Sequence, residues 1–362
     1  MSGAVASVIL TLRYRQPIPI TWTIPGLVYL GTLAGKYSFA EIVGANLMAG
    51  VLIVALGLAG IGGRIMTWLP LPIVMGMFGG SILGYLTRMV TATVQDFAVA
   101  GVTVAGFLIG RAVANPRLPP LGVAVVIGGI AVVVGGHMTP QPVDWSLPTL
   151  VVPEMRFTVP AFFAITLPML VLAMGLGNVQ GMGFLMTQGY RVPVKLVTVV
   201  VGINSIVNSF LGGHPAIVAR TGVAILASPD AGPAAGRYWA NLIASVAVVS
   251  LAFAAAPMTS LFGALPPSYI FTLAGLAVLT AMQDALQTAF GEKLRFGSVV
   301  AFVVAATPFA IAGITSAAWA VVAEFLASAI AERKELVAHW RTAETVPSGL
   351  TETEESECGF PV

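Results

Sequence analysis

Long apolar runs, separated by short charged or proline-rich breaks, cover most of this chain. Runs near twenty residues match a helix that crosses a bilayer, whose hydrocarbon core is about 30 Å thick. The pattern therefore predicts an all-α polytopic membrane protein with the lipid bilayer as a partner. We expect a partial span at 1–12 and further spans at 17–33, 40–61, 66–87, 95–113, 119–137, 160–180, 193–211, 215–228, 237–256, 268–289, 296–310 and 312–332.

The composition narrows the class of protein further. Hydrophobic residues make up 57% of the 362 residues and charged residues only 9%, whereas soluble domains carry about 25% charged residues. A soluble enzyme, a nucleic-acid binder and a disordered protein are therefore disfavoured. The single Cys358 and three scattered histidines favour neither a disulfide framework nor a metal centre, and no cofactor is expected.

The basic residues are divided unequally between the loops that alternate along these spans. Because cytoplasmic loops hold the excess of Lys and Arg, the richer side predicts a cytoplasmic C-terminus. Arg220 belongs to neither side, because it lies inside a span. The richer side has Arg13, Arg15, Arg64, Arg111, Arg117, Arg191, Lys195, Arg237, Lys293, Arg295, Arg333, Lys334 and Arg341, and the other has Lys36, Arg88 and Arg156.

The two halves of the chain echo each other at an offset of about 197 residues. The segment ITWTIPGLVYL at 20–30 resembles IVARTGVAILA at 217–227, and two Leu-Pro-rich segments each open a span. The repeat unit holds seven spans, an odd number, so the copies have opposite orientation. This predicts a 7+7 inverted-repeat transporter fold. By the same offset the first copy lacks one span and a portion of a second, so we expect the natural chain to start before Met1.

The repeat also suggests a division into domains. We expect a core domain and a gate domain, each built from two separate segments of the chain, together with an extracytoplasmic loop and a disordered cytoplasmic tail. In chain order these are the first core segment at 1–61 (N-terminally incomplete), the first gate segment at 62–137, the loop at 138–157, the second core segment at 158–258, the second gate segment at 259–335 and the tail at 336–362.

Two matching segments of the repeat do not read as ordinary spans. Segment 215–228 is too short to cross the bilayer as a helix. Segment 17–33 starts with prolines that favour extended backbone, whereas Pro25 suits the first turn of a helix that Thr23 helps to cap. Each segment is therefore predicted to be an extended stretch followed by a half-helix. The two half-helix N-termini would meet near the midplane, where they attract anions.

Polar residues near these half-helices are candidates for substrate binding. Arg220 either binds an anion or caps backbone carbonyls, and His214 either gates and relays protons or bonds a loop carbonyl. Asn178 and Gln180 either bind a ligand or bridge helices, and Trp22 either lines the pocket or packs in the core. The remaining acids lie near span ends, where solvent contact explains them, and no midplane carboxylate for a proton relay is evident. These acids are Glu41, Asp96, Asp284, Glu292 and Glu324.

Three stretches resemble the benzoate:proton symporter family of bacterial inner membranes: LRYRQPIPITWTIPG at 12–26, LPMLVLAMGLGNVQGMGFLMTQGYRVP at 167–193 and FLGGHPAIVARTGVAILASPDAGPAAGRYWA at 210–240. The resemblance implies the fold of nucleobase transporters and sulfate-permease anion exchangers, with substrate bound between the half-helices. The chain departs from the family pattern at 177–181, and Arg220 stands where a small or apolar residue is usual. The implied site residues are Thr21, Trp22, Thr23, Pro25, Asn178, Gln180, Gly213, His214, Arg220 and Thr221.

The leading hypothesis is a secondary transporter of the inner membrane that imports a benzoate-like aromatic carboxylate with protons by alternating access. A small organic anion and the proton are then its expected partners, nucleic acid is not, and a homodimer is compatible with this reading. A nucleobase or inorganic-anion carrier of the same fold is the first alternative, and an ion channel the second. An enzyme is not expected, because the sequence shows no clustered carboxylates, HExxH motif or Ser/His/Asp grouping.

Overall fold

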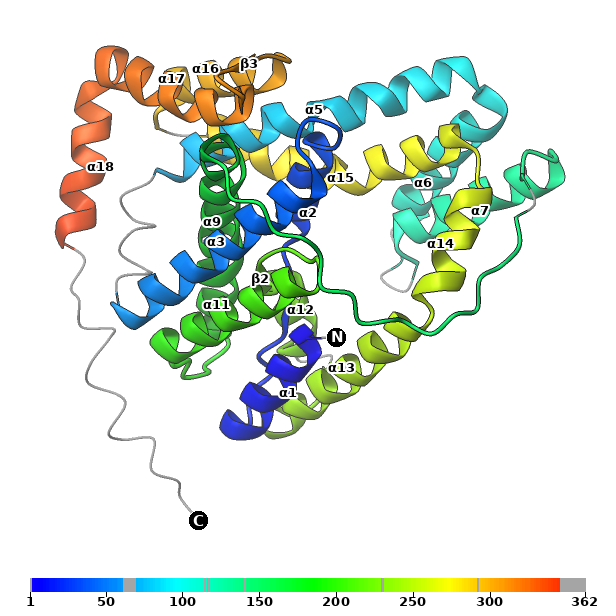
Figure 1. Cartoon of the computed structure of the whole chain (residues 1–362), viewed down its shortest axis with the longest axis horizontal. Coiled ribbons are helices and arrows are strands. Elements are labelled where there is room, and N and C mark those ends of the chain that lie inside the picture. The colour runs from blue at the N-terminus through cyan, green and yellow to red at the C-terminus, as the bar shows by residue number, and fades with distance from the viewer. Residues whose placement is uncertain are drawn as a thin grey trace.

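The computed structural model, which describes residues 2–60, 70–113, 115, 118–139, 141–228, 231–291 and 293–345, is mostly helical (Figure 1). Five helical stretches are long and apolar enough to cross a membrane: Phe39–Leu58, Leu71–Gln95, Val159–Thr187, Ala234–Phe253 and Pro267–Phe290. Shorter apolar helices add to these at Ser2–Tyr14, Phe97–Val113, Pro120–Val134, Val194–Phe210, Arg295–Ala306 and Ser316–Ala331. The prediction of a helical multi-span protein is therefore confirmed in outline, and two short strand pairs accompany the helices.

The beginning of the chain builds two helices, a strand and a half-helix. The elements are α1 (Ser2–Tyr14), β1 (Ile20–Trp22), α2 (Ile24–Thr32) and α3 (Phe39–Leu58). Helix α3 begins with a capping box, because Ser38 Oγ accepts from the Glu41 amide while the Glu41 carboxylate accepts from the Ser38 amide. Such reciprocal bonds satisfy two amides that a helix start otherwise leaves unpaired.

Two of the next three helices start at prolines. Helix α5 (Leu71–Gln95) starts after Pro70 and holds Pro72 in its first turn, where a missing N–H costs nothing. At its end the Asp96 carboxylate accepts from the Val99 amide at 3.3 Å, and the chain continues through the π-helical turn η1 (Phe97–Gly101) into α6 (Val102–Val113). Helix α7 (Pro120–Val134) starts at a proline in the same way.

The second half of the chain repeats the order helix, strand, half-helix and helix. It begins with one long irregular helix in which α-helical and π-helical turns alternate, which we call the winding helical path. The path runs through α8 (Val159–Ala161), η2 (Phe162–Thr166), α9 (Leu167–Val171), η3 (Leu172–Val179) and α10 (Gln180–Thr187). Then come α11 (Val194–Phe210), β2 (Ala216–Val218), α12 (Arg220–Leu226), η5 (Ala234–Gly236), α13 (Arg237–Phe253), α14 (Ala255–Ala264), α15 (Pro267–Phe290), α16 (Arg295–Ala306), β3 (Ala310–Ile311), β4 (Ile314–Thr315), α17 (Ser316–Ala331) and α18 (Arg333–Thr345).

Helices that correspond at the 197-residue offset make corresponding contacts between the two halves. Helix α3 packs on α11, and their counterparts α13 and α1 pack on each other. Helices α5 and α15 are counterparts and cross side by side (Figure 1), and the hairpins α6–α7 and α16–α17 are each tightly paired. Small residues allow the closest approach: a Cβ added at Gly50 of α3 would lie 2.9 Å from the Ile206 amide nitrogen of α11. The high glycine content thus serves helix packing.

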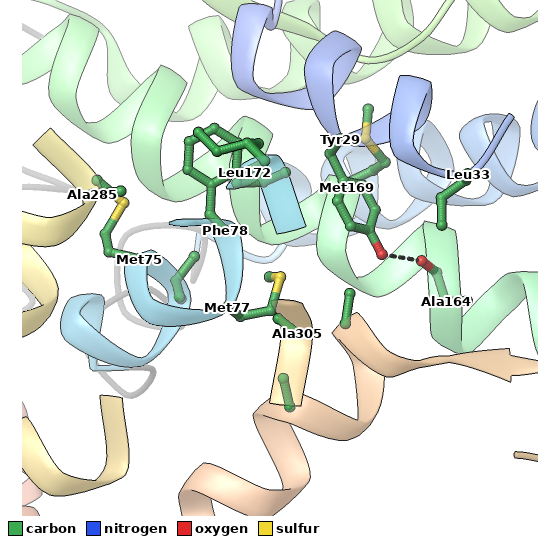
Figure 2. Close-up of a cluster of buried hydrophobic side chains, with 14 of the residues drawn as sticks. Tyr29, Leu33, Met75, Met77, Phe78, Ala164, Met169, Leu172, Ala285 and Ala305 are labelled. Atoms are coloured by element: carbon green, nitrogen blue, oxygen red, sulfur yellow. Dashed lines mark hydrogen bonds between the residues drawn. The ribbon is translucent and has the colours of Figure 1, made fainter. Parts of the chain in front are cut away.

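Two large hydrophobic clusters and two small ones form the core of the described residues. The largest joins α2, α3, α5, α8, η2, α9, η3, α15, α16 and α17, and Figure 2 shows Tyr29, Phe78, Met169 and Leu172 within it. Tyr29 is fully buried, and its hydroxyl donates to the Ala164 carbonyl at 2.5 Å. The second cluster lies around α1, α10, α11 and the two strands, so it surrounds the segments predicted to hold the site.

The predicted disordered tail at 336–362 is wrong for its first ten residues. Helix α18 continues to Thr345, and residues 346–362 lie outside the described part of the chain. The first turn of α18 attaches the helix to the rest of the protein. Leu336 is buried, and the Glu335 carboxylate accepts from the Leu294 amide at 2.8 Å. The loop at 138–157 has no regular structure in its described residues and runs along one face of the molecule (Figure 1).

Candidate functional site

The two predicted extended segments form a single antiparallel strand pair inside the helical fold. Strand β1 pairs with β2 in the register Ile20–Val218, Thr21–Ile217 and Trp22–Ala216. Each strand leads after one residue into a short helix, α2 or α12, and the antiparallel pairing makes these helices leave in opposite directions. The prediction of two half-helices preceded by extended backbone is confirmed. Buried unpaired amides are costly in a membrane, and the pairing satisfies them.

Thr23 stands at the start of the first half-helix and is fully buried. Its Oγ1 accepts a hydrogen bond from the Gly26 amide at 3.2 Å, and Pro25 occupies the first turn. The prediction that Thr23 caps this helix is confirmed. His214 Nε2 lies 3.2 Å from the Thr23 carbonyl oxygen, so the histidine bonds a carbonyl of the opposite half of the chain. This is the second of the two roles expected for it.

Asn178 lies beside β2 and is fully buried. Its Oδ1 accepts from the Val218 amide of β2 at 2.9 Å, and its Nδ2 lies 3.4 Å from Met174 Sδ. Gly181 lets the helix approach, because a Cβ there would overlap the Val218 carbonyl. Asn178 therefore bridges the winding helical path and the strand.

Arg220 is the first residue of the second half-helix, and its side chain is exposed. Its guanidinium donates to Gln180 Oε1 at 3.0 Å, which joins two predicted site residues. Thr221, the next residue, is also exposed. The N-cap position is Ala219, and no side chain caps this helix. The positive charge therefore stands at the edge of the strand pair with one neutral partner.

The turn that carries Gly213 and His214 is held from two sides. The Gly213 amide donates to the Asn208 carbonyl at 2.7 Å, and Asn208 Nδ2 donates to the His214 carbonyl at 3.0 Å. Asn46 Nδ2 donates to the Gly213 carbonyl at 3.4 Å, but its buried Oδ1 has no hydrogen-bond partner among the described residues. The unpaired acceptor thus belongs to a side chain that holds the turn of Gly213 and His214, two residues that the sequence predicted for the site.

A cavity of about 220 Å³ lies beside β1 and brings together Thr21, Trp22 and residues that sequence reasoning missed. The missed polar residues come from α1, α11 and α13. Each is a polar residue inside an otherwise apolar run, which the sequence does show. Because α1 and α13 are far apart in the sequence, their contact around one cavity could not be predicted from it. They are Ser2, Ser7, Asn208, Asn241 and Ser245.

The cavity wall combines hydroxyl and amide groups with one aromatic face. Ser7 fixes β1, because its Oγ donates to the Ile20 carbonyl at 3.0 Å and accepts from the Ile20 amide at 2.7 Å. The Trp22 side chain remains 46% exposed. Of the ten predicted site residues only Thr21 and Trp22 line this cavity; the other eight surround the strand pair. Such a lining accepts a small planar molecule with polar edges.

Within the described ranges, no three His, Cys, Asp or Glu side chains cluster in a way that could hold a metal ion. The candidate site thus consists of the cavity beside β1, lined by hydroxyl, amide and aromatic side chains, and of the Arg220 guanidinium near the strand pair.

Comparison with known proteins places this geometry in a family. The model of the family described as "BenE: Benzoate membrane transport protein" matches residues 1–330. The chain is 30% identical to the inner membrane protein YdcO of Escherichia coli over 89% of the chain and 83% of that protein. It is 26% identical to the benzoate membrane transport protein of Acinetobacter baylyi, over 88% of the chain and 81% of that protein.

Among solved structures, the fold is similar to the transmembrane domain of the cyanobacterial bicarbonate transporter BicA. The TM-score is 0.53 over 94% of this chain and 89% of that domain, with 16% sequence identity. The likeness extends to the arrangement of helices alone, and it supports a multi-pass membrane protein.

Proposed function

The chain belongs to the benzoate membrane transport protein family, and we propose that it imports a benzoate-like aromatic carboxylate together with protons. The observation that carries this proposal is the strand pair β1–β2 with its two half-helices, which brings both halves of the chain to one place. Such discontinuous segments in the two halves of a transporter form the substrate site.

The groups around the strand pair suit an aromatic carboxylate. Trp22 offers a partly exposed ring face for stacking, and Thr21, which lines the same cavity, carries a hydroxyl. Arg220 supplies a positive charge at the edge of the pair, and among the described residues its hydrogen-bond partner is the neutral Gln180. The substrate carboxylate would replace this neutral partner, since an ionised acceptor forms a stronger hydrogen bond with a guanidinium.

Alternating access would come from movement between two helix groups. We assign 1–61 and 158–258 to a core domain, 62–137 and 259–335 to a gate domain, and the whole to a 7+7 inverted repeat in the inner membrane with a cytoplasmic C-terminus. Polar bonds between the described residues of the two groups include the Tyr37 hydroxyl to the Gly313 carbonyl at 2.6 Å and the Tyr85 hydroxyl to the Val28 carbonyl at 3.2 Å. The groups also share a large apolar contact, over which they would slide, and a homodimer fits this scheme.

Uptake of radiolabelled benzoate into proteoliposomes, with and without an inward proton gradient, tests the proposal. We expect saturable uptake that the gradient drives above equilibrium and that unlabelled benzoate competes away. Competition by uracil or sulfate in place of benzoate would instead support a nucleobase or inorganic-anion carrier, an alternative that the uncharged cavity lining favours. Non-saturating currents in a planar bilayer would indicate a channel.

A further inference from the structure

Glu324 is buried, although its position in the sequence predicted contact with solvent. It stands near the middle of α17 and was expected to contact solvent, yet its exposed fraction is 0%. It faces α16 at the closest contact of the α16–α17 hairpin, where a Cβ added at Gly297 would lie 3.1 Å from Glu324 Cγ and would overlap Ser328 Oγ. A carboxyl group therefore occupies a contact surface built for small residues.

The hydrogen bonds around this carboxyl indicate its protonation state. Ser298 Oγ lies 2.8 Å from the Leu294 carbonyl oxygen and 3.2 Å from Glu324 Oε1. A hydroxyl has one proton, and the shorter contact, to a carbonyl that can only accept, uses it. The contact to Oε1 is then satisfied best if the carboxyl itself donates to Ser298.

The other oxygen supports the same conclusion. Glu324 Oε2 is buried and has no hydrogen-bond partner within the described part of the chain. An ionised carboxylate with one weak bond and no counter-ion is too costly to bury in a protein or a bilayer. The group is therefore neutral in this conformation and holds a proton.

No described cation compensates the carboxyl. Of the elements packed on α17, η2 and β4 carry no titratable side chain, and on α5 Arg88 lies over the Phe271 ring. On α16, Arg295 donates to the Gly291 carbonyl. On α18, Arg333, Lys334 and Arg341 are exposed, and His339 Nε2 has no hydrogen-bond partner among the described residues. Glu332, eight residues further along the chain, adds an acid rather than a counter-ion.

A polar stripe links this proton site to one end of the hairpin. Glu324, Ser328 and Glu332 follow at intervals of four residues, so they lie on one face of α17. Ser328 Oγ donates to the Glu332 carboxylate at 3.3 Å, and Glu332 also accepts from the Phe296 and Gly297 amides at 2.8 and 3.0 Å. Glu332 is partly exposed and lies toward the end of α17 that the basic residues assign to the cytoplasm.

From this geometry we propose that Glu324 is a proton-binding site of the protein, and that Ser328 and Glu332 connect it to the cytoplasmic side. The step is a simple protonation: a hydronium ion gives its proton to the carboxylate and leaves water. The role as the site of the co-transported proton rests on the proposed function. The presence of a buried, exchangeable proton on Glu324 does not depend on it.

Infrared spectroscopy of the purified protein in lipid at pH 7 tests the site without any substrate. We expect a C=O band of a protonated carboxyl that is lost in Glu324→Gln and retained in Asp284→Asn, which removes an exposed acid. Ser298→Ala should shift the band, because it removes the partner of Oε1. Ser328→Ala should slow the band's response to D₂O. A protonated-carboxyl band that Glu324→Gln leaves unchanged would overturn the proposal.

Transport then tests the coupling role. Glu324→Gln, which mimics the neutral acid, should retain benzoate exchange across the membrane and lose accumulation driven by a proton gradient. The retained exchange shows that the variant is folded. Accumulation at the wild-type level would overturn the coupling role. If the wild-type protein moves no benzoate at all, the proposed substrate is wrong, and the infrared band still decides whether the proton site exists.

Discussion

The two half-helices occupy matching places in the two halves of the chain but begin in chemically different ways. Helix α2 has nine residues, a Thr23 side-chain cap and Pro25 in its first turn. Helix α12 has seven residues, no side-chain cap and Arg220 as its first residue. A cation is disfavoured at a helix N-terminus, where the helix dipole is positive. The second start is therefore the less stable of the two.

This difference helps to distinguish features that stabilise the fold from features that bind substrate. A feature required for the strand pair alone should occur in both halves, as the extended segments and short helices do. At the offset of 197 residues, Arg220 stands opposite Thr23 and His214 stands opposite Pro17. At these two matched positions the charged or titratable residue thus occurs in the second half only. We infer that α2 anchors the strand pair while α12 responds to the bound molecule.

The largest effect is expected from Asn178→Leu, which removes the support of the second strand. The Val218 amide would lose its acceptor while remaining buried, and such a group costs about 1–3 kcal/mol. Thermal unfolding in detergent should show this loss together with loss of uptake. Gln180→Leu serves as the control, because Gln180 bonds an exposed side chain and should leave the unfolding temperature nearly unchanged. Equal unfolding temperatures for the two variants would refute the bridging role.

The next effect concerns the anchored half-helix. Thr23→Val keeps the shape of the side chain and removes the cap on Gly26, which should lower the free energy of unfolding by about 1 kcal/mol. Thr32→Val is the matched control at the other end of α2, where the hydroxyl only donates to the Tyr29 carbonyl. If both variants lose the same stability, the cap has no special role, and the contrast between the half-helices is lost.

The starts of the half-helices could be predicted from sequence because their signals are local. Proline restricts its own backbone and that of the preceding residue, and Thr23 lies three residues before the amide that it accepts from. The extended segment before α2 could be predicted for the same reason, and the one before α12 through its match in the repeat. Their pairing in one register depends on contacts about two hundred residues apart, which spacing suggested only through the repeat.

The burial of Glu324 and the make-up of the cavity could not be predicted in this way. Position along a span indicates depth in the membrane, but it does not reveal which face of α17 meets α16. The cavity joins Ser7 of α1 with Asn241 of α13, and each residue alone resembles an isolated polar position. The first turns of α18 were missed because their composition is polar, although Glu335 ties them to the Leu294 amide.

Arg220→Ala tests the responsive half-helix and should affect binding more than stability. Loss of the guanidinium should weaken the apparent affinity for benzoate about tenfold, or about 1.4 kcal/mol, with the unfolding temperature unchanged. The wild-type affinity should also fall with added salt more steeply than that of the variant. Arg191→Ala removes an exposed arginine elsewhere and should alter neither property. An Arg220→Ala protein with wild-type affinity would remove the residue from the site.

The smallest effect is expected from giving α12 the kind of cap that α2 already has. Ala219→Ser places a hydroxyl at the N-cap position, where it can accept from an amide of the first turn, and should stabilise the protein by about 0.5–1 kcal/mol. Ala224→Ser, in the middle of the same helix, is the control and should be slightly destabilising, because serine is a poorer helix former than alanine. If an uncapped start lets α12 adapt to substrate, Ala219→Ser should also slow benzoate uptake while Ala224→Ser leaves it unchanged. A stabilised Ala219→Ser protein with wild-type uptake would show that the missing cap has no role in transport, and Arg220 alone would then distinguish the two half-helices.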